Sequence, residues 1–236
     1  MPEARKVILF LVEGPTEKEA LSGVLSRIFG CADLVFKVVH GDITTATSIS
    51  SSNVFKEITE YIRSELILNG FEASDVERVA HLVDTDGCFI PSENIHRTNE
   101  EGILYFLEYV STNHLTQTQK RFQKKSRILN KLTTRNYLTI SRQKIPYYVY
   151  FMSRNLEHAL HNRFESLSSD EKTNLARSFD AEYNNNIHAF YLFINSPEVA
   201  ASGDDYAETW EFIKQGNNSL HRHTNLHCII NEYMEP

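Results

Sequence analysis

Five acidic residues of this sequence follow apolar segments that are typical of buried β-strands. They are Glu13, Glu17, Asp84, Asp86 and Glu157. Carboxylates that gather at one place repel one another and raise each other's pKa, and a divalent cation relieves that repulsion. The set offers only oxygen ligands, without a cysteine or a histidine pair, which favours Mg²⁺ or Mn²⁺ over Zn²⁺. The acidic residues therefore predict a site for one or two hard divalent ions.

Each acidic motif also has a simpler structural interpretation when it is taken alone. Glu13-Gly14-Pro15-Thr16-Glu17 is typical of a helix start, where Thr and Glu serve as cap and dipole partner. Asp84-Thr85-Asp86-Gly87 is typical of a turn. Both motifs follow strands at matching ends, and ligands of open parallel sheets bind outside the carboxyl ends of the strands. Their joint occurrence therefore favours a shared metal site.

The elements that must position these residues alternate between strands and helices. Apolar runs predict strands at residues 7–12, 34–39, 79–83 and 145–152. Helical spacing of apolar residues predicts helices at 20–28, 54–66, 100–110, 115–132, 155–164 and 206–214, and a further strand is expected at 188–195. This order predicts an α/β fold with a parallel sheet, right-handed crossovers and flanking helices.

Charge is distributed very unevenly along the chain. The formal net charge is −7, which by itself argues against a general nucleic-acid coat protein. Residues 109–156, however, hold ten Lys and Arg and no acid, so the rest of the chain sums to −17. Solvated helix faces commonly mix both signs. A basic segment in an acidic protein therefore predicts contacts with phosphate. The candidate nucleic-acid-binding residues are Lys120, Arg121, Lys124, Lys125, Arg127, Lys131 and Arg154.

The two acidic motifs together resemble those of the Toprim family. Val12-Glu13-Gly14-Pro15-Thr16-Glu17 followed by Leu82-Val83-Asp84-Thr85-Asp86-Gly87 is similar to its strand-end Glu-Gly and later Asp-x-Asp. The resemblance covers about residues 5–165 and implies that Glu13, Asp84 and Asp86 are catalytic and hold magnesium at a phosphodiester. In the OLD-type nucleases of this family, further acids match Glu17 and, more loosely, Glu157.

The resemblance implies a Toprim-like sheet of Rossmann type in residues 1–165. A basic helical insert is expected at about 92–144, and a C-terminal extension, 166–236, is expected to pack on the domain. The chain is too short for the additional parts of a topoisomerase or primase, which leaves a stand-alone nuclease. Two metal ions can activate a water and stabilise the leaving oxygen in phosphodiester hydrolysis. Glu13 is alternatively a general acid or base.

The favoured function is a Mg²⁺- or Mn²⁺-dependent endonuclease acting on DNA or RNA. For OLD-like proteins the resemblance implies bacterial anti-phage defence with a separate ATPase or other subunit, since this chain has no P-loop motif. Two alternatives stay open: a ribonuclease that matures structured RNA, and a non-catalytic effector that binds a nucleic acid or a partner.

Histidines and cysteines add little to this interpretation. His221, His223 and His227 form a cluster for which packing or surface roles are favoured over a metal site, and Arg222 beside them is a candidate phosphate contact. Three widely spaced cysteines favour a reducing compartment over a disulfide framework. The longest early apolar run is too short for a signal peptide or a membrane span, so a cytoplasmic location without membrane partners is expected.

Overall fold

The computed structural model describes residues 6–30, 33–38, 43–44 and 46–234, of which the side chains of Asp33 and Val38 are not described. Its contacts divide the chain into two compact units. The first consists of Met1–Leu82, Arg127–Tyr150 and Ala176–Ile187, and the second of Val83–Ser126, Phe151–Leu175 and His188–Pro236. Each unit combines segments that are distant in sequence, so neither unit ends at the predicted boundary after residue 165.

A five-stranded sheet forms the centre of the first unit, in the order β2-β1-β3-β8-β7. Its strands are β1 (Val7–Val12), β2 (Asp33–Val38), β3 (Val76–Asp84), β7 (Tyr137–Ile140) and β8 (Gln143–Met152). β1 pairs in parallel with both β2 and β3, whereas β7 and β8 form an antiparallel hairpin. All six residues of β1 are buried, as expected for a central strand covered on both faces. The predicted α/β fold with a parallel-rich sheet is confirmed, and β7 is an antiparallel edge strand that the apolar pattern did not reveal.

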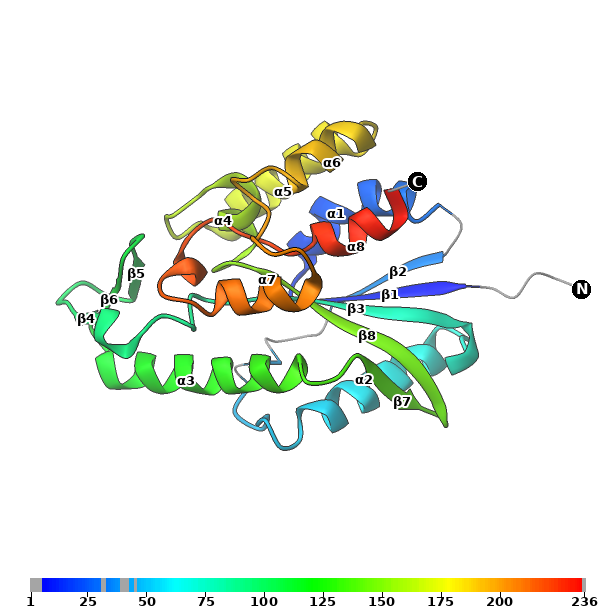
Figure 1. The fold of residues 1–236 in the computed structure, drawn as a ribbon, viewed down its shortest axis with the longest axis horizontal. Helices are drawn as coiled ribbons and strands as arrows, with labels where there is room; N and C mark the ends of the chain where they lie inside the picture. Colours follow the sequence, from blue (N-terminus) through cyan, green and yellow to red (C-terminus); the bar gives the residue numbers. More distant parts are fainter. Residues whose placement is uncertain (1–5, 31–32, 39–42, 45, 235–236) are drawn as a thin grey trace, which may run out of the picture. The chain divides into compact units, whose positions relative to one another are not determined.

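Two helices connect the parallel strands of this unit. α1 (Pro15–Ile28) and α2 (Val54–Leu68) lie on opposite faces of the sheet (Figure 1). Opposite faces are expected because the crossover from β1 to β2 and the crossover from β2 to β3 run in opposite directions, and both are right-handed. Of the predicted second strand and its end, Val39, Gly41 and Asp42 lie outside the described residues.

The second unit contains a small three-stranded sheet where a helix was predicted. Its strands are β4 (Ile95–Arg97), β5 (Ile103–Tyr105) and β6 (Val110–Thr112), in the order β4-β6-β5. The predicted helix at 100–110 is therefore wrong. Gly102 has a φ of +87°, outside the helical region, and the Phe106 amide donates to the Tyr109 carbonyl at 3.0 Å, which closes a turn between β5 and β6. The predicted insert at about 92–144 is thus only partly helical, through α3 (Leu115–Leu132).

The remaining helices are short, apart from α5. They are α4 (Leu156–His161), α5 (Ser169–Tyr183), α6 (Ile187–Ile194), α7 (Tyr206–Ile213), α8 (His227–Met234) and the 3₁₀ turns η1 (Ala73–Asp75), η2 (Ser92–Asn94) and η3 (Asn218–Leu220). The predicted strand at 188–195 is wrong, because α6 buries Phe190 and Ile194, which are four residues apart on one helical face. In the part of the chain that is described, no helix combines the length and apolar character needed to cross a membrane.

Candidate metal and phosphate site

The Asp-x-Asp motif forms a tight turn at the end of β3. Asp84 is the last residue of that strand, and both Asp86 and Gly87 have positive φ angles, +51° and +68°. Asp tolerates this left-handed conformation better than most residues, whereas a side chain at Gly87 would place its Cβ 2.7 Å from Leu220. The turn therefore needs residues that tolerate a positive φ at positions 86 and 87, and it takes Asp86 out of the extended conformation of the strand.

Hydrogen bonds anchor this turn to the segment that follows β8. The Thr85 amide donates to the Met152 carbonyl at 3.0 Å, and the Asp86 amide donates to the Arg154 carbonyl at 2.9 Å. The Thr85 hydroxyl accepts from the Arg154 amide at 2.9 Å. Thr85 is completely buried, so these bonds hold the ends of β3 and β8 together away from solvent. Thr85, the middle residue of the motif, is a positioning residue that the sequence did not reveal.

Two cations of α3 bind the Asp86 carboxylate. Its Oδ2 atom lies 2.7 Å from Arg121 Nη2 and 2.9 Å from Lys125 Nζ. The Lys125 side chain is 1% exposed, that of Asp86 17% and that of Arg121 45%. A lysine so deeply buried is stable only when it is paired. Lys125 therefore neutralises Asp86, whereas Arg121 also reaches the surface.

Arg154 is held by aromatic rings and backbone. Its guanidinium carbon lies 4.3 Å from the centre of the Tyr105 ring and 5.3 Å from that of Phe164, and Nη2 donates to the Phe164 carbonyl at 2.8 Å. The residue is 5% exposed, and burial lowers the pKa of its guanidinium. Tyr105 donates in turn to the Asp86 carbonyl at 3.3 Å, and burial followed by the Asp86 charge raises its pKa. The guanidinium group of Arg154 thus lies beside the turn and contacts the rings of Tyr105 and Phe164.

Glu157 lies in the first turn of α4. Asn155 caps this helix by accepting from the His158 amide at 2.9 Å. The Glu157 carboxylate is 5% exposed and lies 3.3 Å from Lys172 Nζ. In the second unit, Asp86 and Glu157 therefore each have an ammonium partner.

Glu13 and Glu17 belong to the first unit. Glu13 directly follows β1 and is half-buried. Glu17 is 6% exposed, and its Oε2 atom accepts from the Thr16 hydroxyl at 3.3 Å. A Cβ at Gly14 would lie 3.1 Å from that same oxygen, so the glycine leaves room for the carboxylate to fold over the turn. The meeting of these two acids with Asp84, Asp86 and Glu157 stays a prediction.

The other predicted phosphate-binding residues lie along α3. Lys120 and Arg127 are exposed, and Lys124 and Lys131 are half-buried. A hollow of about 140 Å³ near the start of the helix is bordered by Arg121, His114 and Gln117, with Thr112 and Thr118 beside them. The helix therefore presents cations and polar groups to solvent next to the residue that binds Asp86.

The donor set suits a hard divalent ion by its chemistry, because Asp84, Asp86 and Glu157 offer only carboxylate oxygens. Within the described ranges, no group of three or more His, Cys, Asp or Glu side chains is arranged to hold a metal ion. A metal ion at Asp86 must therefore compete with Lys125 and Arg121. In such an exchange the metal ion takes the place of Lys125 or Arg121 at the Asp86 carboxylate.

Residues 223–225 fix the end of β8, a role that the sequence did not indicate. The Ser153 amide donates to the His223 carbonyl and the His223 amide to the Ser153 hydroxyl, both at 2.8 Å. Asn225 accepts from the Phe151 amide at 2.8 Å, and the Thr224 hydroxyl donates to the Phe151 carbonyl at 2.6 Å. The segment thus holds the backbone immediately before Arg154.

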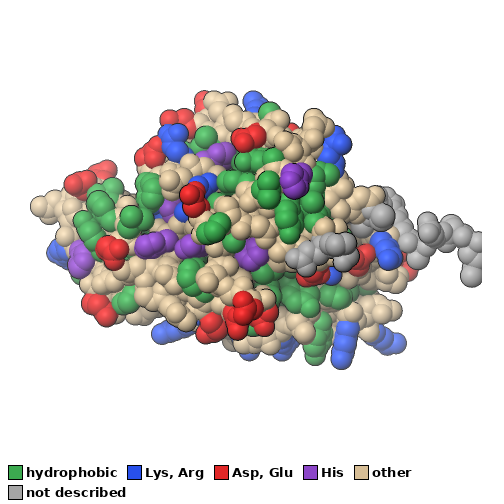
Figure 2. Space-filling model, turned by 45° about the horizontal axis from the view of Figure 1, so that its top comes forward, with side chains coloured by type: hydrophobic (Ala, Val, Ile, Leu, Met, Phe, Trp, Pro, Cys, Tyr) green, Lys and Arg blue, Asp and Glu red, His purple; other side chains and the backbone are tan. Residues whose placement is uncertain are grey.

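The C-terminal histidines are packed rather than clustered. The His223 ring stands edge-on to Phe212 at 4.9 Å, and burial lowers its pKa to about 4. Burial also lowers the pKa of His227. Arg222 donates to the carbonyls of Ala159 and Leu160 at 3.0 and 2.7 Å, so it caps the end of α4. Figure 2 shows where histidine side chains reach the surface of one face.

Comparison of the chain with protein-family models, with curated proteins and with solved structures finds no match.

Proposed function

We propose that this protein is a metal-dependent nuclease that hydrolyses phosphodiester bonds of DNA or RNA. One observation carries the proposal: the Asp-x-Asp turn and the basic helix, which the sequence suggested for metal and for phosphate, meet at Asp86. Arg121 and Lys125 both contact its carboxylate. A nuclease requires this proximity, because the ion and the phosphate that it activates must lie side by side.

Each group in this proposal has a distinct task. Asp84 and Asp86 hold the divalent ion, with Glu157 as a further ligand from the same unit. When bound, the ion supplies an activated water and stabilises the charge that develops on the phosphate. Arg121 and the α3 cations beside it hold the phosphates of the substrate. Thr85 and Tyr105 keep the turn in place, and Arg154 stacks beside it.

The partners of Asp86 suggest how a substrate would enter. Arg121 is 45% exposed and can move from the carboxylate to a phosphate without uncovering a buried charge. Lys125 is 1% exposed and keeps the carboxylate neutralised until an ion arrives. Lys125 thus balances the charge of Asp86 before a substrate binds, and binding of an ion must displace its ammonium group from the carboxylate.

A second candidate is a non-catalytic module that binds nucleic acid. The buried Lys125 favours it, because an ammonium group already satisfies Asp86 without any metal. Under this proposal the cations of α3 bind phosphate, and the carboxylates only position them. Because the sequence resembles OLD-type nucleases, the nuclease proposal includes a role in defence together with a separate ATPase. Maturation of structured RNA is the alternative role for the same nuclease activity.

The test is cleavage of plasmid DNA and of structured RNA with Mg²⁺ or Mn²⁺ present. We expect cleavage of at least one substrate by the wild type, its loss with EDTA, and its loss in Asp84→Ala plus Asp86→Ala. Asp170→Ala plus Asp204→Ala is the matched control, since it removes two exposed carboxylates of the second unit. Nucleic-acid binding without metal-dependent cleavage would support the non-catalytic module instead and overturn the nuclease.

A further inference from the structure

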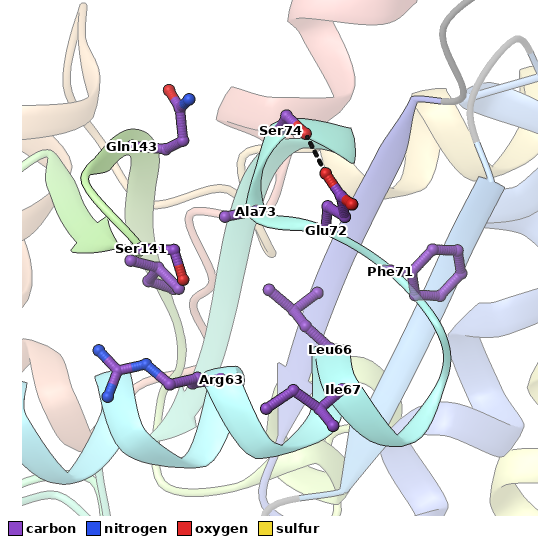
Figure 3. A pocket seen from close by; sticks show the side chains of 10 residues that line it. Arg63, Leu66, Ile67, Phe71, Glu72, Ala73, Ser74, Ser141 and Gln143 are labelled. Carbon is purple, nitrogen blue, oxygen red and sulfur yellow. Dashed lines mark hydrogen bonds between the residues drawn. The ribbon is translucent and has the colours of Figure 1, made fainter.

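A groove runs between α2 and the β7–β8 hairpin in the first unit. One hollow of about 350 Å³ is bordered by Leu66 and Ile67 of α2 and by Ile140, Ser141 and Gln143 of the hairpin (Figure 3). A second hollow of about 260 Å³ lies farther along the helix. Arg63 borders both, so the two hollows are neighbours, and together they are called the groove below.

One end of this groove is cationic. Lys56, Arg63 and Arg135 line the second hollow, with Glu60 as the one acidic residue among its lining residues. Glu60 lies 3.8 Å from Lys56, in an ion pair whose side chains are 53% and 71% exposed. The attraction within such an exposed ion pair is weak. The Arg135 guanidinium stacks 4.6 Å from the centre of the Phe55 ring, which fixes its position.

The other end is mainly apolar. Leu66, Ile67, Phe71, Ala73 and Ile140 line the larger hollow, and the Ile67 side chain is 74% exposed. Polar side chains border it as well; they are Glu72, Ser74, Ser141 and Gln143. Figure 3 shows the side chains of α2 on one side of this hollow and the turn that carries Ser141 on the other. An apolar surface with a few convergent polar groups is typical of a small-molecule site.

Protection of the sheet edge does not explain these cations. Exposed edge strands often carry Lys or Arg, which prevent pairing with another chain. β7 is an edge strand, and Arg135 lies just before it. Arg63 and Lys56 lie on α2, however, and Arg63 makes no hydrogen bond or ion pair with any residue in the described part of the chain. An exposed guanidinium between a cationic and an apolar hollow is instead suited to an anionic ligand that has an apolar body.

We propose that this groove binds a nucleoside phosphate, with the base in the apolar hollow and the phosphate at Arg63, Lys56 and Arg135. A planar base can pack on the exposed Ile67 side chain and form a hydrogen bond with Ser141. The groove belongs to the first unit and does not involve Asp84 or Asp86. Its ligand is either a free nucleotide or one nucleotide of a single strand, and the two sources share this chemistry.

Fluorescence anisotropy in EDTA, with labelled AMP and labelled single-stranded DNA and RNA, tests the groove without the metal. We expect Arg63→Glu to weaken binding at least about tenfold, because a charge-assisted hydrogen bond is removed and a repulsive charge is added. Lys18→Glu is the matched control, since Lys18 is exposed on α1, on the other face of the sheet.

A second pair of variants tests the apolar end. We expect Ile67→Ser to weaken binding several-fold, whereas Leu68→Ser should not, because Leu68 is equally exposed at 78% but does not line the groove. Binding of AMP with an affinity close to that of the oligonucleotides assigns the groove to free nucleotides, and binding of oligonucleotides alone assigns it to a strand. No binding of any probe, or equal losses in Arg63→Glu and Lys18→Glu, would overturn the proposal. Both results are independent of cleavage.

Discussion

The charge balance at Asp86 depends on a single buried lysine. We expect Lys125→Met to lower the free energy of unfolding by about 1 to 2 kcal/mol in metal-free buffer, because Asp86 loses its buried partner and keeps only Arg121. The accessible carboxylate should then bind metal more readily. Mn²⁺ is therefore expected to raise the stability of Lys125→Met more than that of the wild type. Urea unfolding with and without Mn²⁺ measures both effects.

The double variant Lys125→Met plus Asp86→Asn is the control for this prediction. Removing both charges leaves no unpaired ion, so most of the lost stability should return. A Lys125→Met variant that is as stable as the wild type without metal would show that the ion pair does not hold the turn.

A second prediction at the residue scale concerns His223. Burial lowers its pKa from the ordinary 6.5 to about 4. Between these values the unfolded chain takes up a proton that the folded protein does not bind, so His223 makes stability fall as the pH drops from about 6.5 to 4. His223→Gln should make this dependence shallower between pH 6.5 and 5. Thermal unfolding across that range measures it, with His188→Gln as the control for removing an exposed imidazole. An unchanged slope in His223→Gln would contradict the prediction.

The sequence indicated the candidate carboxylates but not their neighbours. Residue type and position after a strand are enough to select Asp84, Asp86 and Glu157. Tyr105 was not recognised, because it lay in a segment assigned to the wrong element. Lys125 appeared to be one cation among many. Helical spacing does place it on the buried face of α3, because Lys125 lies three residues after Phe122 and four before Leu129.

At the scale of elements, the nuclease proposal assigns nucleic-acid binding to the cations of α3. Lys120→Glu plus Lys124→Glu should weaken nucleic-acid binding and flatten its salt dependence. The logarithmic slope should decrease by nearly one for each phosphate of duplex DNA that the helix no longer neutralises, and somewhat less on a single strand. Filter binding at several salt concentrations measures this. Lys125 is unsuited to such a charge reversal, because it is buried and would test folding instead.

The matched control is the double variant Lys6→Glu plus Lys18→Glu. It makes the same change of net charge at two exposed lysines of the first unit. Equal changes of slope in the two double variants would show that net charge, and not this helix, governs binding.

The elements differ in how well their sequences determine them. α3 was predicted at its observed bounds, since its apolar stripe is long and regular. The segment at 100–110 has apolar residues at helical spacing, but Gly102 and the turn at 106–109 favour a hairpin. In α6 the aromatic residues and the short length suggested a strand. Short apolar runs fit both periodicities, and only tertiary packing distinguishes them.

At the scale of the whole molecule, the parallel part of the sheet was predictable and the grouping of segments was not. Buried runs such as β1 have a clear signature. The hairpin β7–β8 is local, but its two-residue turn places Ser141 and Arg142 at positive φ, which these residue types do not signal. The assignment of residues 223–225 to the end of β8 depends on a pairing between distant parts of the chain, which no local pattern encodes. Residues 223–225 of the C-terminal segment therefore lie at the end of β8, next to the candidate site.

The nuclease proposal depends above all on Asp84 and Asp86 holding a divalent ion, and Mn²⁺ binding is its sharpest test. Titration followed by electron paramagnetic resonance and calorimetry measures it on the wild type and on Asp84→Asn plus Asp86→Asn, with circular dichroism to confirm that the variant is folded. We expect the wild type to bind one or two ions and the double variant to lose this binding. Binding that is equal in both proteins, or absent from the wild type, would contradict the proposal.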